Sequence, residues 1–274
     1  MYDRERLREA VRHFYDIQTV RMQHSGRISR KSAGNEVVIS DEQRAAWAAQ
    51  VKRLEGVERE ALVVVKEKLD LIPFWSVLQA DDERWTGLGP TMAGVLLSEV
   101  DIVRATTVSK LWRFAGLAPV AAWRCQSCSR VVQRTEVGWE HTKKKANERT
   151  CEREKEVLRE GQVRDSGTTE RAKKGEKRHY NLFLKTKLLG VLAGSFLRAN
   201  KGEGNSIWRP VYDGYKHRLE SSGRSTSPGQ LHKAASRYMI KMFLIEFWKE
   251  WRAHEGLEVR PPYQEEKLKH RHVA

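Results

Sequence analysis

Three cysteines and one histidine form the sharpest chemical pattern in the sequence, Cys125-x2-Cys128-x12-His141-x9-Cys151. Three thiolates and one imidazole can close a tetrahedral zinc site, with the closely spaced cysteine pair forming a knuckle. Because four protein ligands leave no open coordination position, the pattern predicts a structural zinc ion rather than a catalytic one. The spacing before Cys151 is longer than usual, so His179 is the alternative to His141. Incidental cysteines are the competing interpretation.

The segment that carries this pattern is highly charged and poor in aliphatic side chains. Residues 121–180 contain 16 basic and 10 acidic side chains, and 16 − 10 gives a net charge of +6. A bound metal would supply folding free energy that burial cannot supply here. Clustered positive charge beside a zinc knuckle favours contact with nucleic-acid phosphates, and a solvated face is the alternative. The candidate phosphate ligands are Lys143, Lys144, Lys145, Arg171, Lys173, Lys174, Lys177 and Arg178.

A second candidate contact is the Gly87-Leu88-Gly89-Pro90 stretch between two apolar helical segments. Glycine has no Cβ and permits a tight turn, and the N-terminus of the next helix offers unpaired N–H groups to a phosphate. The pattern predicts a helix–hairpin–helix in which Gly87 and Gly89 lie at a nucleic-acid backbone. An ordinary interhelical turn is the alternative.

The overall charge agrees with a polyanionic partner. The chain has 274 residues, with 51 Lys and Arg against 36 Asp and Glu, which gives a net charge of +15. This excess favours nucleic acid before acidic lipid. The most apolar run, residues 188–197, is far shorter than the ~20 residues that span hydrocarbon, so a membrane protein is excluded. Few cysteines and no apolar signal core predict a reducing compartment, a nucleoid-associated protein of the cytoplasm.

Several enzyme classes are excluded by missing motifs. The sequence has neither a Gly-x4-Gly-Lys-Ser/Thr phosphate loop nor a Gly-x-Ser-x-Gly elbow, which argues against an ATPase and an α/β-hydrolase. Acidic clusters occur at 81–83 and 99–101. They do not predict a two-metal nuclease, because such a site needs carboxylates that converge from several strands.

The elements that must position these residues are expected to be helices, and the fold class is mostly α with almost no strand. Apolar periodicity predicts helices over 3–24, 41–70, 108–115, 181–197, 208–219 and 230–253. Ser40 and Gln43 form a capping-box signature for the second helix. The same periodicity puts Val20, Met22 and Val57 on the apolar sides of the first two helices. A polar loop is expected over 25–35 and another over 221–229.

The composition shifts along the chain suggest four regions. They are an N-terminal helical arm (1–80), a helix–hairpin–helix core (81–120), a charged zinc-binding insertion (121–177) and a C-terminal region with amphipathic helices (178–274). The last predicted helix carries six large apolar side chains at helical spacing. They are Met239, Met242, Phe243, Phe247, Trp248 and Trp251.

Two stretches resemble a known family. They are Trp85-Thr-Gly-Leu-Gly-Pro-Thr-Met-Ala-Gly-Val-Leu-Leu-Ser-Glu99 and Leu111-Trp-Arg-Phe-Ala-Gly-Leu-Ala-Pro119, followed by Ser166-Gly167, Lys174-Gly175 and Asn181-x-x-Leu184-Lys185. In this order the motifs resemble the C-terminal domain of the DEDD insertion-sequence transposases of family one hundred and ten, which are bridge-RNA-guided recombinases. The resemblance covers roughly residues 85–253, and its most specific part is 85–119.

The resemblance implies DNA recombination in which Ser166 is the nucleophile that forms a covalent link to DNA, with a guide RNA as a further partner. A serine hydroxyl needs an activating base or charge to do this. The sequence departs from the family in two ways. About 45 residues, including the Cys/His pattern, lie between Pro119 and Ser166, and no RuvC-like domain with DEDD carboxylates precedes residue 81. A homo-oligomer or a DEDD-containing partner, which would also hold Mg²⁺, would then complete the activity.

Three hypotheses follow from the sequence. The first is a transposase-like recombination protein that acts on DNA. The second is a non-catalytic, zinc-stabilised DNA- or RNA-binding factor derived from a mobile element. The third is a helical assembly protein whose positive charge only keeps it dissolved, with residues 1–70 and 230–253 making the oligomer contacts.

Overall fold

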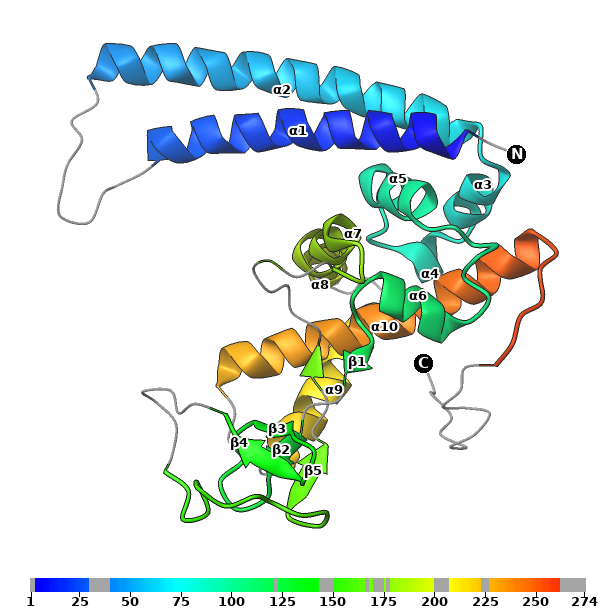
Figure 1. Ribbon diagram of the computed structural model, residues 1–274. Coiled ribbons are helices and arrows are strands. Elements are labelled where there is room, and N and C mark those ends of the chain that lie inside the picture. The colour runs from blue at the N-terminus through cyan, green and yellow to red at the C-terminus, as the bar shows by residue number, and fades with distance from the viewer. Residues whose placement is uncertain are drawn as a thin grey trace. The chain divides into compact units, whose positions relative to one another are not determined.

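The fold is mostly helical, as the sequence predicts (Figure 1). A computed structural model describes residues 3–29, 40–120, 123–142, 150–165, 168–169, 175, 178–199, 207–222 and 227–261. The chain divides into two compact units. We call Met1–Leu111 with Phe183–Ala274 the helical unit and Trp112–Leu182 the Cys/His unit. Among the described helices, none is long and apolar enough to cross a membrane.

The helices lie close to their predicted positions. In chain order they are α1 (Arg4–Ser29), α2 (Asp41–Asp70), α3 (Pro73–Ala80), α4 (Asp82–Trp85), α5 (Pro90–Glu99), α6 (Val108–Phe114), α7 (Leu182–Lys187), the π-helical turn η1 (Leu188–Leu192), α8 (Ala193–Ala199), α9 (Trp208–Ser221) and α10 (Pro228–His254). The single helix predicted over 181–197 is therefore three consecutive segments, because η1 interrupts it.

Helices α1 and α2 run side by side in opposite directions (Figure 1). The capping box at α2 is confirmed, since Ser40 Oγ accepts from Gln43 N at 3.2 Å and the Gln43 side chain accepts from Ser40 N at 3.4 Å. The predicted end of α1 at residue 24 is wrong, because the helix continues to Ser29. Arg44 of α2 donates to the Ile28 carbonyl at 3.1 Å and so satisfies part of the last turn of α1.

Three predicted apolar positions of α1 and α2 are exposed instead of buried. Val20, Met22 and Val57 are 43%, 60% and 43% exposed. The buried residues of α2 are Ala61, Val65 and Leu69, all in its C-terminal half, where α5 also packs against the pair. Two helices alone have no third surface to cover the remaining apolar side chains, so periodicity overestimates burial there.

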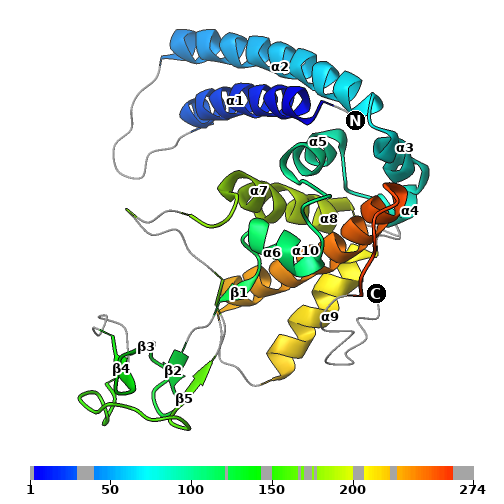
Figure 2. The ribbon, with the colours of Figure 1, turned by 45° about the vertical axis from the view of Figure 1, so that its right-hand side comes forward.

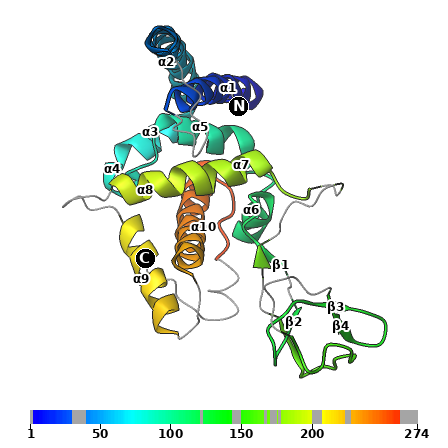
Figure 3. The ribbon, with the colours of Figure 1, turned by 90° about the vertical axis from the view of Figure 1, so that its left-hand side faces the viewer.

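The helical unit is built in layers below this pair. Helix α5 packs on α1 and α2, η1 packs on both α5 and α10, and α8 and α9 pack on α10 (Figures 2 and 3). All six large apolar residues predicted for the face of α10 are buried. The Phe243 ring is central, with ring centroids of Phe196, Trp208 and Trp85 at 5.0, 5.4 and 6.0 Å. These separations lie within the roughly 4.5–7 Å range of packed aromatic pairs.

The Cys/His unit is different, because its regular elements are very short strands. The strands are β1 (Pro119–Val120), β2 (Trp123–Cys125), β3 (Val132–Arg134), β4 (Trp139–His141), β5 (Val163–Asp165) and β6 (Thr168–Thr169). They form three antiparallel pairs, β1 with β6, β2 with β5 and β3 with β4. Strands this short carry no detectable alternation of apolar and polar residues, which is why the sequence did not indicate them.

Candidate metal centre

The short strands bring the four predicted ligands together. Cys125 ends β2, Cys128 lies in the following turn, His141 ends β4 and Cys151 follows in a loop. Their ligand atoms all lie within 4.8 Å of one another. Residues up to 26 positions apart in sequence thus point at one small volume that could hold a metal ion.

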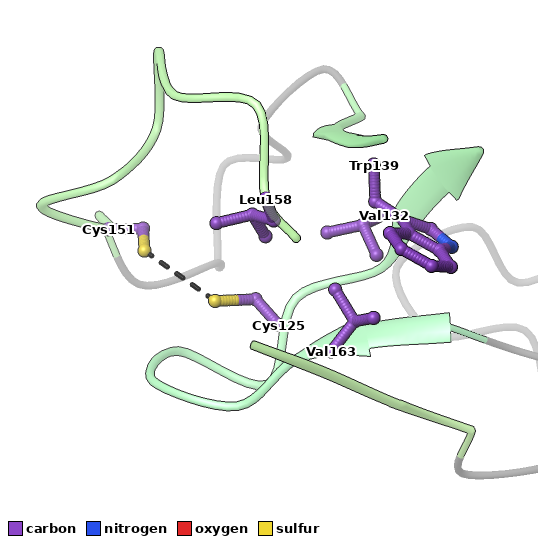
Figure 4. Packing of buried hydrophobic residues seen from close by; sticks show 6 residues of the cluster. All are labelled: Cys125, Val132, Trp139, Cys151, Leu158 and Val163. Atoms are coloured by element: carbon purple, nitrogen blue, oxygen red, sulfur yellow. Dashed lines mark hydrogen bonds between the residues drawn. The ribbon is translucent and has the colours of Figure 1, made fainter. Parts of the chain in front are cut away.

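Two distances inside this cluster are close to those of tetrahedral coordination. Cys125 Sγ and Cys151 Sγ are 4.0 Å apart (Figure 4), and Cys128 Sγ is 3.4 Å from His141 Nε2. Tetrahedral bonds of about 2.3 Å to sulfur and about 2.0 Å to nitrogen would separate two sulfurs by about 3.8 Å and a sulfur from a nitrogen by about 3.5 Å. The three cysteines are free thiols. The residues present therefore fit a four-coordinate ion.

The turn from Cys125 to Arg130, which we call the knuckle, prepares the first thiolate. Cys125 N donates to the Arg130 carbonyl at 3.0 Å, and Ser129 N donates back to the Cys125 carbonyl at 2.9 Å. Burial opposes ionisation of Cys125, but backbone N–H groups of Cys128 and Ser127 donate to its sulfur and, with His141, lower its pKa to about 6. Ser129 takes up the left-handed conformation, with φ +60°, that closes the turn.

The second thiol of the knuckle, Cys128, is harder to ionise than the first. Burial, together with the adjacent Cys151 and Cys125 side chains, raises the pKa of Cys128 to about 11, although the Arg130 N–H donates to its sulfur. Neighbouring thiolates repel one another in a buried site, and the positive charge of a bound divalent cation would offset this repulsion and so favour the deprotonated thiols.

The histidine presents one ring nitrogen to the cluster. His141 Nε2 faces Cys128, whereas Nδ1 is buried and finds no hydrogen-bond partner among the described residues. Coordination through Nε2 would leave the proton on Nδ1. The alternative ligand, His179, is exposed and does not belong to the cluster. The structure thus brings together the predicted set that contains His141.

Apolar support for the site is thin. The cluster of buried residues around it consists of Cys125, Val132, Trp139, Cys151, Leu158 and Val163 (Figure 4). Trp139 and Leu158 also exchange main-chain hydrogen bonds of 3.0 and 2.7 Å. Two candidate ligands, Cys125 and Cys151, are therefore part of the small core itself.

The Gly-x-Gly turn is present, but its first glycine has a packing role. Gly87 has φ +93°, and a Cβ there would lie 2.8 Å from Phe196 Cδ1. Gly89 is the N-cap of α5, and a Cβ there would meet nothing within 4 Å. The helix before the turn, α4, has only four residues. Contact of Gly87 and Gly89 with phosphate stays a prediction.

Most of the other predicted site residues lie outside the part of the chain that the structure describes. They are Ser166, Lys143, Lys144, Lys145, Arg171, Lys173, Lys174 and Lys177. Arg178 is described and is exposed. Two residues of the knuckle were missed by sequence reasoning, Ser129 with its left-handed backbone and the buried Arg130. Their position directly after the second cysteine is the signal that could have identified them.

No protein-family model matches the chain, and no curated protein matches it in sequence. The fold and the site therefore define the class: a mostly helical protein with a Cys₃His cluster that could hold a metal ion.

Proposed function

We propose that this chain is a nucleic-acid-binding protein whose Cys/His unit is held together by a structural zinc ion. The observation that carries the proposal is the convergence of Cys125, Cys128, His141 and Cys151 within 4.8 Å. Three thiolates and an imidazole in tetrahedral array are a ligand set that zinc takes in structural sites. When bound, zinc supplies cross-linking of the unit and leaves no open position for chemistry.

The charge of the chain supports nucleic acid as the partner. The net charge is +15, and the segment that holds the ligands carries +6 from 16 basic and 10 acidic residues. Lys143, Lys144 and Lys145 follow His141 closely in sequence. A zinc-stabilised unit would anchor this basic segment to a folded region, from which its lysines can contact phosphates. Phosphate contacts make the binding affinity fall as the salt concentration rises.

The test is a salt titration of binding by the full-length, zinc-loaded chain to labelled DNA and RNA oligonucleotides, read by fluorescence anisotropy. We expect steep salt dependence, and replacement of Lys143, Lys144 and Lys145 with alanine should lower the slope by about one per lost phosphate contact. A matched control removes three exposed charges of α2, Lys52, Arg53 and Lys66. Weak, salt-insensitive binding would contradict the proposal and favour a helical assembly protein.

A second candidate function is a transposase-like DNA recombinase with Ser166 as nucleophile. One observation favours it: β1 pairs with β6, so Pro119, which ends the Ala-Gly-Leu-Ala-Pro motif, lies opposite Thr169, just after the Ser166-Gly167 motif. Trp123 likewise pairs with Asp165. The ligand-bearing segment leaves and returns at neighbouring points, which suits an insertion between two motifs that belong together.

An adduct trap tests this candidate. DNA that spans the flanks of the gene is incubated in extract from cells that express the protein, denatured in detergent and probed for protein-linked DNA. The candidate predicts an adduct with the natural chain and none with Ser166→Ala. A partner in the extract would supply the DEDD carboxylates with Mg²⁺, and a guide RNA where one is used. Salt-sensitive binding without an adduct in either protein supports the non-catalytic, zinc-stabilised factor.

A further inference from the structure

Arg130 is an unusual residue for its surroundings. Among the residues of the Cys/His unit whose burial the structure describes, it is the only charged one that is buried, and its side chain is 3% exposed. Burying a guanidinium is costly unless hydrogen bonds and a counter-charge compensate it. A small apolar core offsets little of the cost of burying a charge, so the contacts of Arg130 indicate what compensates for its burial.

The side chain of Arg130 joins two distant segments. Its Nη1 donates to Glu154 Oε1 at 2.8 Å, and its Nη2 donates to the Thr142 carbonyl at 2.8 Å. Thr142 directly follows His141, and Glu154 N donates to the Cys151 carbonyl at 3.1 Å. One guanidinium thus holds the segments that carry the third and fourth candidate ligands.

The main chain of Arg130 joins the remaining two ligands. Its carbonyl accepts from Cys125 N at 3.0 Å, and its N–H donates to the Cys128 sulfur. Main chain and side chain together therefore contact all three segments from which the four ligands come. These contacts are hydrogen bonds and an ion pair, so they can join the ligand segments in a unit whose small apolar core includes two of the cysteines.

We propose that Arg130 is a positioning residue for the metal centre and sets its metal affinity by holding the His141 and Cys151 segments against the knuckle. The inference rests on the proposed zinc site. The planar fork of arginine reaches two acceptors in fixed directions, whereas a lysine ammonium behaves as a point charge. Residues behind the ligands commonly change metal affinity by about 10–100-fold when they are replaced.

The test measures zinc affinity of the full-length chain by competition with a chromophoric chelator. Arg130→Met should weaken zinc binding by about 10–100-fold. Arg130→Lys should recover part of this loss through Glu154, and Glu154→Gln should lose less than Arg130→Met because its amide oxygen still accepts. The matched control is Arg134→Met, which removes an exposed arginine of β3.

A second readout separates positioning from general destabilisation. Cobalt(II) replaces zinc, and its absorption spectrum reports the geometry and the thiolate ligands. Arg130→Met should alter this spectrum while Arg134→Met keeps that of the natural chain. Equal zinc affinity and equal spectra for the natural chain and Arg130→Met would overturn the inference while leaving the zinc site intact. Failure of the natural chain to bind either ion would overturn the proposed site itself, and the inference with it.

Discussion

The helical unit and the Cys/His unit differ in the interactions that can stabilise each of them internally. The helical unit buries whole aromatic side chains such as Phe243, Trp248 and Trp208, each at 0% exposure. Burying one such side chain contributes up to about 3 kcal/mol. In the Cys/His unit, by contrast, two of the six buried cluster residues are the cysteines Cys125 and Cys151. The comparison teaches that one region has a large apolar core to stabilise it, whereas the other has a small core that includes two candidate ligands and, under the proposed function, would depend on the ion they bind.

The largest effect that separates the units should follow zinc removal. Apparent binding free energies of structural zinc are about 10–16 kcal/mol, so a strong chelator should unfold the Cys/His unit. The helical unit, which holds none of the four ligands, should keep its fold. Hydrogen exchange read by mass spectrometry should show loss of protection in β2, β3 and β4 and retained protection in α10. Equal protection with and without chelator in the strands would refute the comparison.

A substitution in the aromatic core tests the helical unit, as zinc removal tests the Cys/His unit. Phe243→Ala deletes a fully buried ring that packs against Phe196 and Trp208. Loss of such a side chain costs about 3–5 kcal/mol through lost burial and a residual cavity. Chemical denaturation followed by the circular dichroism of the helices should report this loss. The zinc content per chain should stay unchanged, and a proportional loss of zinc would argue that the two units do not differ in the proposed way.

Within the helical unit, the two glycines of the Gly87-Leu88-Gly89 turn should behave differently. Gly87→Ala meets Phe196 Cδ1 at 2.8 Å and keeps a left-handed backbone, which costs an L-residue about 1–2 kcal/mol before the clash is added. Gly89→Ala meets nothing within 4 Å and should cost less than about 1 kcal/mol as a weaker N-cap. Thermal unfolding of both variants compares them. Similar losses at both positions would contradict the packing role of Gly87.

The smallest predicted effect concerns the left-handed backbone of Ser129 in the knuckle. Ser129 has φ +60°, a conformation that glycine adopts at no steric cost. Ser129→Gly should therefore stabilise the zinc-loaded Cys/His unit by about 0.5–1 kcal/mol, measured as a later chelator-induced unfolding midpoint. Ser127→Gly is the control, because Ser127 does not have a positive φ and only backbone freedom would change. A gain at residue 127 instead of 129 would be inconsistent with this geometry.

Much of the helical unit could be predicted because helical periodicity and caps are local signals. Helix α2 begins and ends where Ser40 and the apolar pattern indicate, and the buried face of α10 is as expected. The exposure of Val57 could not be predicted, since it depends on how far α5 extends along α2. Periodicity reports which side of a helix is apolar, whereas burial depends on what else packs there.

In the Cys/His unit the chemistry was more predictable than the structure. Spacing and residue type were enough to identify Cys125, Cys128, His141 and Cys151, because zinc accepts few ligand types. The strands β2, β3 and β4, each three residues long, left no pattern to detect. The role of Arg130 was hidden as well, because a buried arginine and a solvated one look alike in a sequence with 51 basic residues. Catalysis by Ser166 stays a prediction.

The measurement that tests the central claim most directly is X-ray absorption at the zinc edge of the purified full-length chain, combined with its zinc content. The account predicts one zinc ion per chain, with three sulfur neighbours at about 2.3 Å and one nitrogen neighbour at about 2.0 Å. The same spectrum from Cys125→Ser should lose one sulfur neighbour. A chain without stoichiometric zinc, or a zinc shell of oxygen and nitrogen alone, would contradict the claim that this ion organises the Cys/His unit.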